Sequence, residues 1–384
     1  MVPEPKLLVP GPTPVPQAIF QAMITPMVAH RNPETVELQQ SIVQRLQTLW
    51  STSGPIILQT SSGSGALEAS IANACARGDR VLAVSAGAFG ERFGTIAGKL
   101  GMQVDWLRFP WGEASPPDDI AAALRQKDYQ AVLLIHNETS TGVLHPIPEI
   151  ARAIRSLVPA ILVDSISGTP SVPTEVDPWE IDAIIATSQK GFMMPPGLGL
   201  VGLGHDSLSR FRGEAGLYFD FGPSTTGQFH YTMPVSMIFA LAKSLDLLEE
   251  EGAETRFARH RLMSDMVCAG AEALGFTVFG SMAHQSPTVT VVAPPEGVSN
   301  HDVRNFAHQH GLDLAGGIGQ WGDRALRVGH VGATGPLDML MALNIMELAL
   351  AALGSIPVDG RGSAAALRVW ERNVRKLETE SLKA

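Results

Sequence analysis

Short apolar runs alternate with longer, partly polar segments between about residue 55 and residue 205. Nearly continuous apolar runs are typical of strands that are buried on both faces of a parallel sheet. The segments between them have the length and composition of helices that cover such a sheet, which predicts an α/β fold. The predicted strands are 56–58, 81–84, 104–107, 131–135, 160–163, 184–186 and 200–203, with helices near 66–76, 91–100, 117–125 and 147–157.

This rhythm ends at a segment rich in Gly, Pro, Ser, Thr and aromatic residues, 213–234, which we interpret as a long ordered loop. A long helix is predicted at 236–251, and a smaller α+β region follows with strands at 277–279, 288–292 and 325–328. A charged helix near 364–377 is expected to be peripheral. We therefore predict a large domain, 15–250, and a small domain made of 1–14 and 251–384.

Composition narrows the function classes. The chain has 384 residues, a net charge of −10 and no basic cluster, which argues against nucleic acid or an anionic membrane as a partner. The N-terminus lacks the pattern of a signal peptide, and the most apolar stretch, 337–353, carries charged residues. Cys75 and Cys268 are far apart and have no metal-ligand spacing, so we expect a reducing, cytoplasmic location and no metal site.

Candidate chemistry starts with two residues at strand ends. Asp164 ends the run 160–163, and Lys190 follows the run 184–186 in the string Thr-Ser-Gln-Lys-Gly. Ligand sites of open α/β sheets lie at the carboxyl ends of strands. A carboxylate and an amine placed there together suit pyridoxal phosphate, whose aldehyde reacts with a lysine and whose ring nitrogen pairs with an acid. Taken singly, Asp164 is more typical of a helix N-cap and Lys190 of a solvated surface charge.

Other predicted loops at strand ends carry residues that suit the same cofactor. The segment 60–68 is rich in Ser and Gly and opens a helix, so its free amides could bind a phosphate, although an ordinary capped turn has the same pattern. Phe89 could lie on a planar ring or plug the core, and the hydroxyl-rich segment 136–142 could reach a ring oxygen or form a capping box. Arg327 sits in an apolar strand, where it would hold a carboxylate or form a structural ion pair.

Taken in order, these segments resemble the class V, fold-type I pyridoxal-phosphate aminotransferases, most closely the alanine/serine–glyoxylate branch. The resemblance runs from residue 9 to about residue 353. It rests on Val9-Pro10-Gly11-Pro12-Thr13-Pro14, His30-Arg31, Ser62-Gly63-Ser64-Gly65-Ala66-Leu67-Glu68, Glu138-Thr139-Ser140-Thr141-Gly142-Val143, Asp164-Ser165, Ser188-Gln189-Lys190-Gly191, Pro195-Pro196-Gly197, Thr232-Met233-Pro234 and Arg327-Val328-Gly329.

The resemblance implies a fold-type I transferase with a mainly parallel seven-stranded sheet between helices and a smaller C-terminal α+β domain. It also implies a homodimer whose active site is shared across the interface. Lys190 would carry the cofactor as a Schiff base and move the α-proton, and Asp164 would pair with the ring nitrogen. The other implied roles are phosphate binding by Ser62, Gly63, Ser64 and Gln189, and by Thr232 of the neighbouring subunit; ring contacts by Phe89 and Thr139; and substrate carboxylate binding by Arg327 near Gly11.

The implied reaction is ping-pong transfer of an amino group from a small amino acid, serine or alanine, to a 2-oxo acid, and the expected acceptor is glyoxylate. One position departs from the alanine–glyoxylate relatives, because Phe229 stands where they have Tyr, which leaves the roles of His230 and Tyr231 open. His30-Arg31 could supply a second cation, so aspartate or phosphoserine remain alternative donors. A cysteine desulfurase and a non-catalytic accessory subunit are further alternatives.

Overall fold

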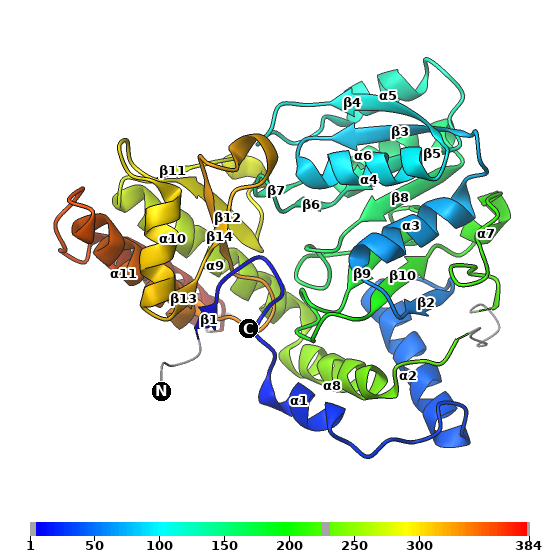
Figure 1. The fold of residues 1–384 in the computed structure, drawn as a ribbon, viewed down its shortest axis with the longest axis horizontal. Helices are drawn as coiled ribbons and strands as arrows, with labels where there is room; N and C mark the ends of the chain where they lie inside the picture. Colours follow the sequence, from blue (N-terminus) through cyan, green and yellow to red (C-terminus); the bar gives the residue numbers. More distant parts are fainter. Residues whose placement is uncertain (1–4, 224–230, 382–384) are drawn as a thin grey trace.

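The computed structural model describes residues 5–223 and 231–381, with side chains described as far as Arg375. A seven-stranded sheet forms the centre of the larger part of the molecule (Figure 1). Only β10 runs antiparallel to its neighbours, so the prediction of a mainly parallel seven-stranded sheet is confirmed. In spatial order the strands are β2 (Ile56–Gln59), β10 (Gly199–Leu203), β9 (Ala183–Thr187), β8 (Ala160–Asp164), β5 (Ala131–Ile135), β3 (Arg80–Ser85) and β4 (Gln103–Arg108).

Both faces of the central strands are buried, which explains their unbroken apolar sequences. In β5, Val132 and Leu134 pack into one core cluster, whereas Leu133 and Ile135 pack into another on the opposite face. Side chains alternate between the two faces of a strand, so each face needs its own apolar set. The helices of this part are α1 (Gln17–Met23), α2 (Pro33–Leu49), α3 (Gly63–Ala74), α4 (Ala88–Lys99), α5 (Pro117–Leu124), α6 (Ile147–Ile154), α7 (Ser207–Arg210) and α8 (Val235–Glu251).

A second, smaller sheet follows α8 in the chain. It has four strands, all antiparallel, in the order β11 (Thr277–Val278), β12 (Val289–Ala293), β15 (Leu326–Gly329) and β14 (Ala315–Gly316). It packs with α9 (Ala253–Ala273), α10 (Asn300–Gln309), α11 (Pro336–Ala352) and α12 (Arg361–Ser381) around a core of its own. The predicted α+β character of the C-terminal region is therefore confirmed.

The first strand of the chain pairs with this smaller region. β1 (Lys6–Leu7) runs parallel to β13 (Leu312–Asp313), and Leu8 is fully buried in the same core. The chain then crosses to α1 beside the large sheet (Figure 1). Segment 9–16 thus passes between the two regions, where it reaches the loops at the carboxyl ends of the large sheet.

Helix α12 packs against the small region through its first half. Ala366 is fully buried, and a Cβ at Gly362 would lie 2.9 Å from the side chain of Leu274. The small residues therefore let α12 approach α9 closely, although the helix is charged elsewhere. Among the helices that the structure describes, none is long and apolar enough to cross a membrane.

Candidate active site

Loops that follow β5, β8 and β9 lie side by side, because these three strands are parallel neighbours in the sheet. Asp164 is the last residue of β8, and Lys190 comes three residues after the end of β9. Adjacent parallel strands bring their carboxyl ends to one edge, so residues far apart in sequence meet there. This arrangement places the predicted acid and amine at a common site.

A cavity of about 330 Å³ lies at this edge. Eight of the nine residues predicted to bind a cofactor line it, and they come from four different loops and the end of β8. They are Ser62, Gly63, Ser64, Phe89, Thr139, Asp164, Gln189 and Lys190. Leu67, Arg92, Asn137, Ile166 and Ser167 complete the lining and were not predicted.

Asp164 is a buried carboxylate with few partners. The Ile166 amide donates a hydrogen bond to Oδ1 of Asp164 at 2.8 Å, and Asp164 is 5% exposed. Burial raises the pKa of Asp164 to about 7, with a further contribution from the negative charge of Glu138, while Lys190 and Arg92 act in the opposite direction. A carboxylate at this position gains strongly from a cationic ligand group that can donate a hydrogen bond to it.

Lys190 is held by the N-terminal segment. Its Nζ donates to the carbonyl oxygen of Pro10, and the Thr13 hydroxyl donates to the carbonyl oxygen of Lys190 at 3.1 Å. Gly11 has a φ of 123°, and a Cβ there would lie 2.5 Å from Lys190 Nζ, so only glycine fits. Burial lowers the pKa of Lys190 to about 8, helped by the positive charge of Arg327. A large share of the amine is therefore neutral near pH 8 and able to act as a nucleophile or base.

The segment 61–65 forms the start of α3. Ser62 is the N-cap, and its Oγ accepts from the Gly65 amide at 3.4 Å. The amides of Gly63 and Ser64 occupy the first turn, where a helix leaves its N–H groups without intrahelical partners. A Cβ at Gly63 would lie 2.6 Å from Ile166 Cδ1, so glycine is needed for the turn to lie this close to the Asp164 loop. The predicted anion cup thus opens into the cavity.

Phe89 is positioned by a buried glutamate whose role was not predicted. Glu138 is fully buried and accepts hydrogen bonds from the amides of Phe89 and Gly90 at 3.1 and 3.0 Å. The Ser140 hydroxyl also donates to Glu138, at 2.5 Å. Burial raises the pKa of Glu138, and these hydrogen bonds oppose the rise. Glu138 therefore caps α4 and fixes the ring of Phe89 at the cavity wall, with the guanidinium of Arg92 5.1 Å from the ring centre.

The remaining predicted hydroxyl, Thr139, belongs to a small polar network. Its Oγ1 donates to Ser167 Oγ at 2.6 Å, and Ser167 Oγ donates in turn to the Asn137 carbonyl oxygen at 3.0 Å. All three residues are buried and line the cavity. The loops after β5 and β8 are thus joined directly at the site.

Arg327 is buried in β15 and interacts with backbone rather than with an acid. Its Nε donates to the Gly316 carbonyl oxygen at 2.8 Å and its Nη1 to the Thr139 carbonyl oxygen at 3.4 Å. Among the described residues it takes part in no ion pair, so the alternative of a structural ion pair is not observed. Burial lowers the pKa of Arg327 to about 10. A substrate carboxylate would compensate this buried charge.

Several residues considered from the sequence lie outside the cavity of their own chain. Thr232 is exposed before α8, and the Tyr231 hydroxyl donates to the Leu58 carbonyl oxygen at 3.0 Å. His30 and Arg31 do not line the cavity either. Phe229 and His230 lie outside the described residues.

Comparison with known proteins agrees with this geometry. The family model described as "Aminotransferase class-V" matches residues 10–320. The chain belongs to the class V aminotransferases. This family membership makes it a transaminase of fold type I and implies dependence on pyridoxal phosphate.

Individual relatives cover almost the whole chain. The serine–glyoxylate aminotransferase of Methylorubrum extorquens is 34% identical over 96% of this chain and 96% of its own length. A protein named soluble hydrogenase small subunit, from a Synechococcus species, is 33% identical over 94% of this chain and 97% of its own. Among solved structures, the ureidoglycine–glyoxylate aminotransferase of Bacillus subtilis superposes with a TM-score of 0.90 at 28% identity, covering 97% of this chain and 99% of its own.

The cavity of this class V aminotransferase fits the implied cofactor. It combines the amides of Gly63 and Ser64 in the first turn of a helix, an aromatic ring on one wall, a buried acid and an amine of lowered pKa. Its volume is at the lower end of the range for small-molecule sites, about 300–1,000 Å³. Each functional end of pyridoxal phosphate therefore finds a complementary group in the cavity.

Proposed function

We propose that this transaminase moves the amino group of a small amino acid, serine or alanine, to a 2-oxo acid, glyoxylate, by a ping-pong mechanism. The observation that carries the proposal is the gathering of Asp164, Lys190 and the start of α3 in one cavity, with Arg327 close enough to influence the pKa of Lys190. Serine–glyoxylate and alanine–glyoxylate aminotransferases among the relatives support the substrates, with identities of 34% and 30%.

We assign the residues of the cavity accordingly. Ser62, Gly63, Ser64 and Gln189 would bind the phosphate, Phe89 and Thr139 would contact the ring, and Asp164 would pair with the ring nitrogen. Bound pyridoxal phosphate supplies an aldehyde and an electron-poor ring that accepts the electrons released at the amino-acid Cα. Arg327 binds the substrate carboxylate, and the Glu138 carboxylate holds the Phe89 loop in place.

The protein groups then divide the proton chemistry. Asp164 stays ionised when a protonated ring nitrogen faces it, because the cation offsets the burial that raises its pKa. Lys190, once its amine is free, would remove the proton from the amino-acid Cα and deliver it to the carbon that the cofactor aldehyde supplies, as a general acid and base. The neutral amine needed for the first step is available because burial lowers the pKa of Lys190 to about 8.

The pH dependence of proton removal follows from this value. We expect the single-turnover rate constant for the amino-acid half-reaction to rise with pH and level off above about pH 8, since the fraction of neutral Lys190 grows through its pKa. Stopped-flow absorbance of the bound cofactor measures this rate constant. A rate that stays flat from pH 6.5 to about 9.5 would contradict the assignment of Lys190 as the base.

Replacing Arg327 by Gln is expected to lower kcat/KM for the amino acid by about 10²–10³-fold, because charge-assisted hydrogen bonds to a carboxylate contribute about 1.5–3 kcal/mol each. The loss should be smaller for the matching amine that lacks a carboxylate. Steady-state rates with L-alanine and ethylamine make this comparison. Equal losses for both donors would show that Arg327 supports the fold of the site rather than the carboxylate.

A dicarboxylate donor is the second candidate, and one observation favours it. A donor such as aspartate needs a second cation, and Arg92 lines the cavity beside Phe89, exposed and without an ion pair among the described residues. The L-aspartate–glyoxylate aminotransferase of Paracoccus denitrificans, 32% identical over 94% of this chain, supports this alternative. The nearby Arg108 is engaged with Glu91 and serves as a matched control.

One experiment separates these donors. Purified protein is given glyoxylate together with L-serine, L-alanine, L-aspartate or phosphoserine, and glycine is measured. The leading proposal predicts glycine from serine or alanine with the larger kcat/KM. A clear preference for aspartate that is lost in Arg92→Gln but kept in Arg108→Gln would replace it, and no glycine from any donor would refute the acceptor assignment.

Cysteine desulfuration is disfavoured by the positions of the thiols. Neither Cys75 nor Cys268 lines the cavity, and burial raises their pKa values to about 12 and about 11. A persulfide-forming cysteine must reach the substrate as a thiolate. The likeness to a cysteine desulfurase from Thermococcus onnurineus, 14% identical, concerns the fold alone.

We also propose that two copies of the chain form the working unit. Thr232 is exposed outside its own cavity, and the apolar residues Phe20, Ile24 and Met27 near α1 are 50%, 81% and 72% exposed. A contact between copies would cover this apolar surface. Sedimentation equilibrium should give twice the chain mass, and mixing of inactive Lys190→Ala and Thr232→Val chains should restore activity if the site is shared.

A further inference from the structure

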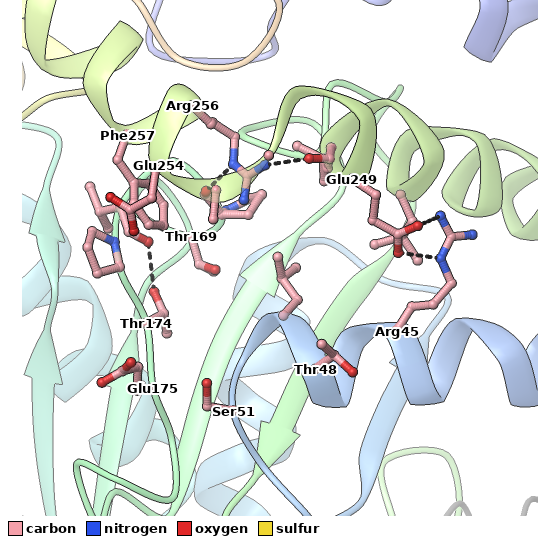
Figure 2. A pocket seen from close by; sticks show the side chains of 18 residues that line it. Arg45, Thr48, Ser51, Thr169, Thr174, Glu175, Glu249, Glu254, Arg256 and Phe257 are labelled. Carbon is pink, nitrogen blue, oxygen red and sulfur yellow. Dashed lines mark hydrogen bonds and ion pairs between the residues drawn. The ribbon is translucent and has the colours of Figure 1, made fainter. Parts of the chain in front are cut away.

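A second cavity, of about 440 Å³, lies between the large and small regions (Figure 2). Its walls come from α2, from the segment 169–175, from the end of α8 and from the start of α9. It is larger than the cavity at Lys190 and shares no lining residue with it. Nothing in the amino-transfer reaction requires this space.

Arg256 places a buried cation at the wall of this cavity. The residue is 2% exposed, its Nε donates to the Pro170 carbonyl oxygen at 2.7 Å, and its Nη1 donates to the Leu248 carbonyl oxygen at 2.8 Å (Figure 2). None of the ion pairs among the described residues includes Arg256. The nearby acid Glu251 acts on Arg256 at a distance but is ion-paired with Arg259. A buried guanidinium without a direct ion pair is costly, and a bound carboxylate would offset that cost.

The start of α9 adds donors at the same wall. Gly252 precedes the helix, and no side chain caps the amides of its first turn. Gly252, Ala253 and Glu254 all line the cavity. Free amides at the N-terminus of a 21-residue helix favour an anion, and Arg256 is the fourth residue of this helix.

The rest of the lining does not suit a simple anion. Glu254 and Glu175 are exposed lining residues that take part in no ion pair among the described residues, whereas Arg45 is already engaged by Glu249 and Asp246. In Figure 2, Glu175 lies across the cavity from Arg256. Apolar side chains fill part of the wall between these charges, namely Leu49, Val172, Leu245, Leu248 and Phe257.

We propose that this cavity binds an apolar amino acid as a zwitterion. Its carboxylate would bind Arg256 and the first turn of α9, and its ammonium group would face Glu254 and Glu175. Its side chain would lie against the apolar wall. This site is separate from the catalytic cavity and its existence does not depend on the identity of the amino donor.

Close backbone contacts connect the segments that line the two cavities. A Cβ at Gly191, next to Lys190, would lie 2.6 Å from Pro170 Cδ and 3.0 Å from the Thr169 carbonyl oxygen, so these segments are in close contact. His260 also accepts from the Gly332 amide at 3.3 Å and donates through Nδ1 to the Arg256 carbonyl oxygen. A substitution at Arg256 can therefore disturb the catalytic loops and change turnover indirectly. For this reason the experiment measures binding of the amino acid instead of turnover.

The test is isothermal titration of the holoenzyme with L-leucine, whose side chain suits the apolar wall. The Arg327→Gln holoenzyme is titrated in parallel, since it lacks the guanidinium that we assign to the substrate carboxylate in the catalytic reaction. We expect one site per chain that persists in Arg327→Gln. The affinity for leucine should fall about tenfold or more in Arg256→Gln and several-fold in Glu254→Gln. Glu296→Gln, an exposed control, should leave the affinity unchanged.

Two further probes test the zwitterion. The oxo acid 4-methyl-2-oxopentanoate lacks the ammonium group and 3-methylbutylamine lacks the carboxylate, so each should bind about tenfold more weakly than leucine. The absence of a leucine site in Arg327→Gln would overturn the proposal, as would binding that Arg256→Gln leaves unchanged. Equal binding of the oxo acid would overturn the zwitterion. If circular dichroism shows that Arg256→Gln does not fold, the exposed Glu254→Gln variant takes its place. Unchanged leucine binding in Glu254→Gln would then overturn the proposal.

Discussion

Replacing Lys190 by Ala is expected to lower the rate of amino transfer by about 10⁴-fold, while the protein stays folded. The amine is the base at the α-carbon, and general acid–base catalysis contributes about 10²–10⁴-fold. Burial lowers the pKa of Lys190, so part of the amine is neutral and able to accept a proton, and the Pro10 carbonyl oxygen holds the amine in position. The variant also loses the covalent link to the cofactor, so the effect should lie at the upper end of that range.

The measurement is the single-turnover rate with L-alanine or L-serine at pH 8, with circular dichroism as the check on folding. Lys99→Ala, an exposed lysine on α4, is the matched control and should keep the activity of the unmodified enzyme. If Lys190→Ala retained more than about a tenth of the rate, another group would have to be the base.

The Asp164→Asn substitution is expected to act in opposite directions on activity and on stability. Activity should fall by about 10²–10³-fold, because an amide cannot hold the positive charge on the ring nitrogen that a carboxylate holds, and electrostatic groups at active sites contribute on this scale. The cofactor-free protein should become more stable at pH 8. Burial raises the pKa of Asp164 from 3.8 to about 7, which corresponds to a cost of about 4 kcal/mol for the ionised group at pH 8.

The direction of the pKa shift of Asp164 determines the pH range in which the substitution stabilises the protein. A carboxyl with a raised folded-state pKa costs nothing below pH 3.8, where it is protonated in both states, and costs most above about pH 7. The gain in the free energy of unfolding for Asp164→Asn should therefore be full at pH 8 and fade toward pH 4. Urea unfolding of the cofactor-free chains at both pH values measures it.

Asp182 offers the matched contrast. It is fully buried like Asp164, but it forms ion pairs with Arg155 and Arg210, both at 2.6 Å. Asp182→Asn should destabilise the protein by about 1.5–3 kcal/mol, since it removes the charge that accepts hydrogen bonds from the partly exposed guanidiniums of Arg155 and Arg210. If Asp164→Asn also destabilised the cofactor-free chain at pH 8, the carboxylate would be part of the fold rather than a group kept for a ligand.

The sequence allowed the large sheet and most of the catalytic cavity to be predicted. Continuous apolar strands and the loops after them place Asp164, Lys190 and Ser62 at one edge, because strand polarity alone decides which loops meet. The orientation of β10 was not predictable from periodicity, since a fully buried strand has the same pattern in either direction. Packing against β2 and β9 sets it.

Residues that act through distant partners were missed. Glu138 has the sequence context of a local cap, and only the fold brings the start of α4 to its carboxylate. Ser167 lies in an ordinary polar turn, and only the fold brings Thr139 to it from a different loop. Arg256 lies in a helix with several other charged residues, so its burial depends on the contact between α9 and the segment 169–175.

The most direct test of the central claim is to locate the cofactor on the chain. The purified protein is loaded with pyridoxal phosphate, reduced with borohydride and digested, and the peptides are sequenced by mass spectrometry. The account predicts one phosphopyridoxyl group per chain, on Lys190, and none in Lys190→Ala. A group on any other lysine, or none on the unmodified protein, would contradict the assignment of this cavity as the active site.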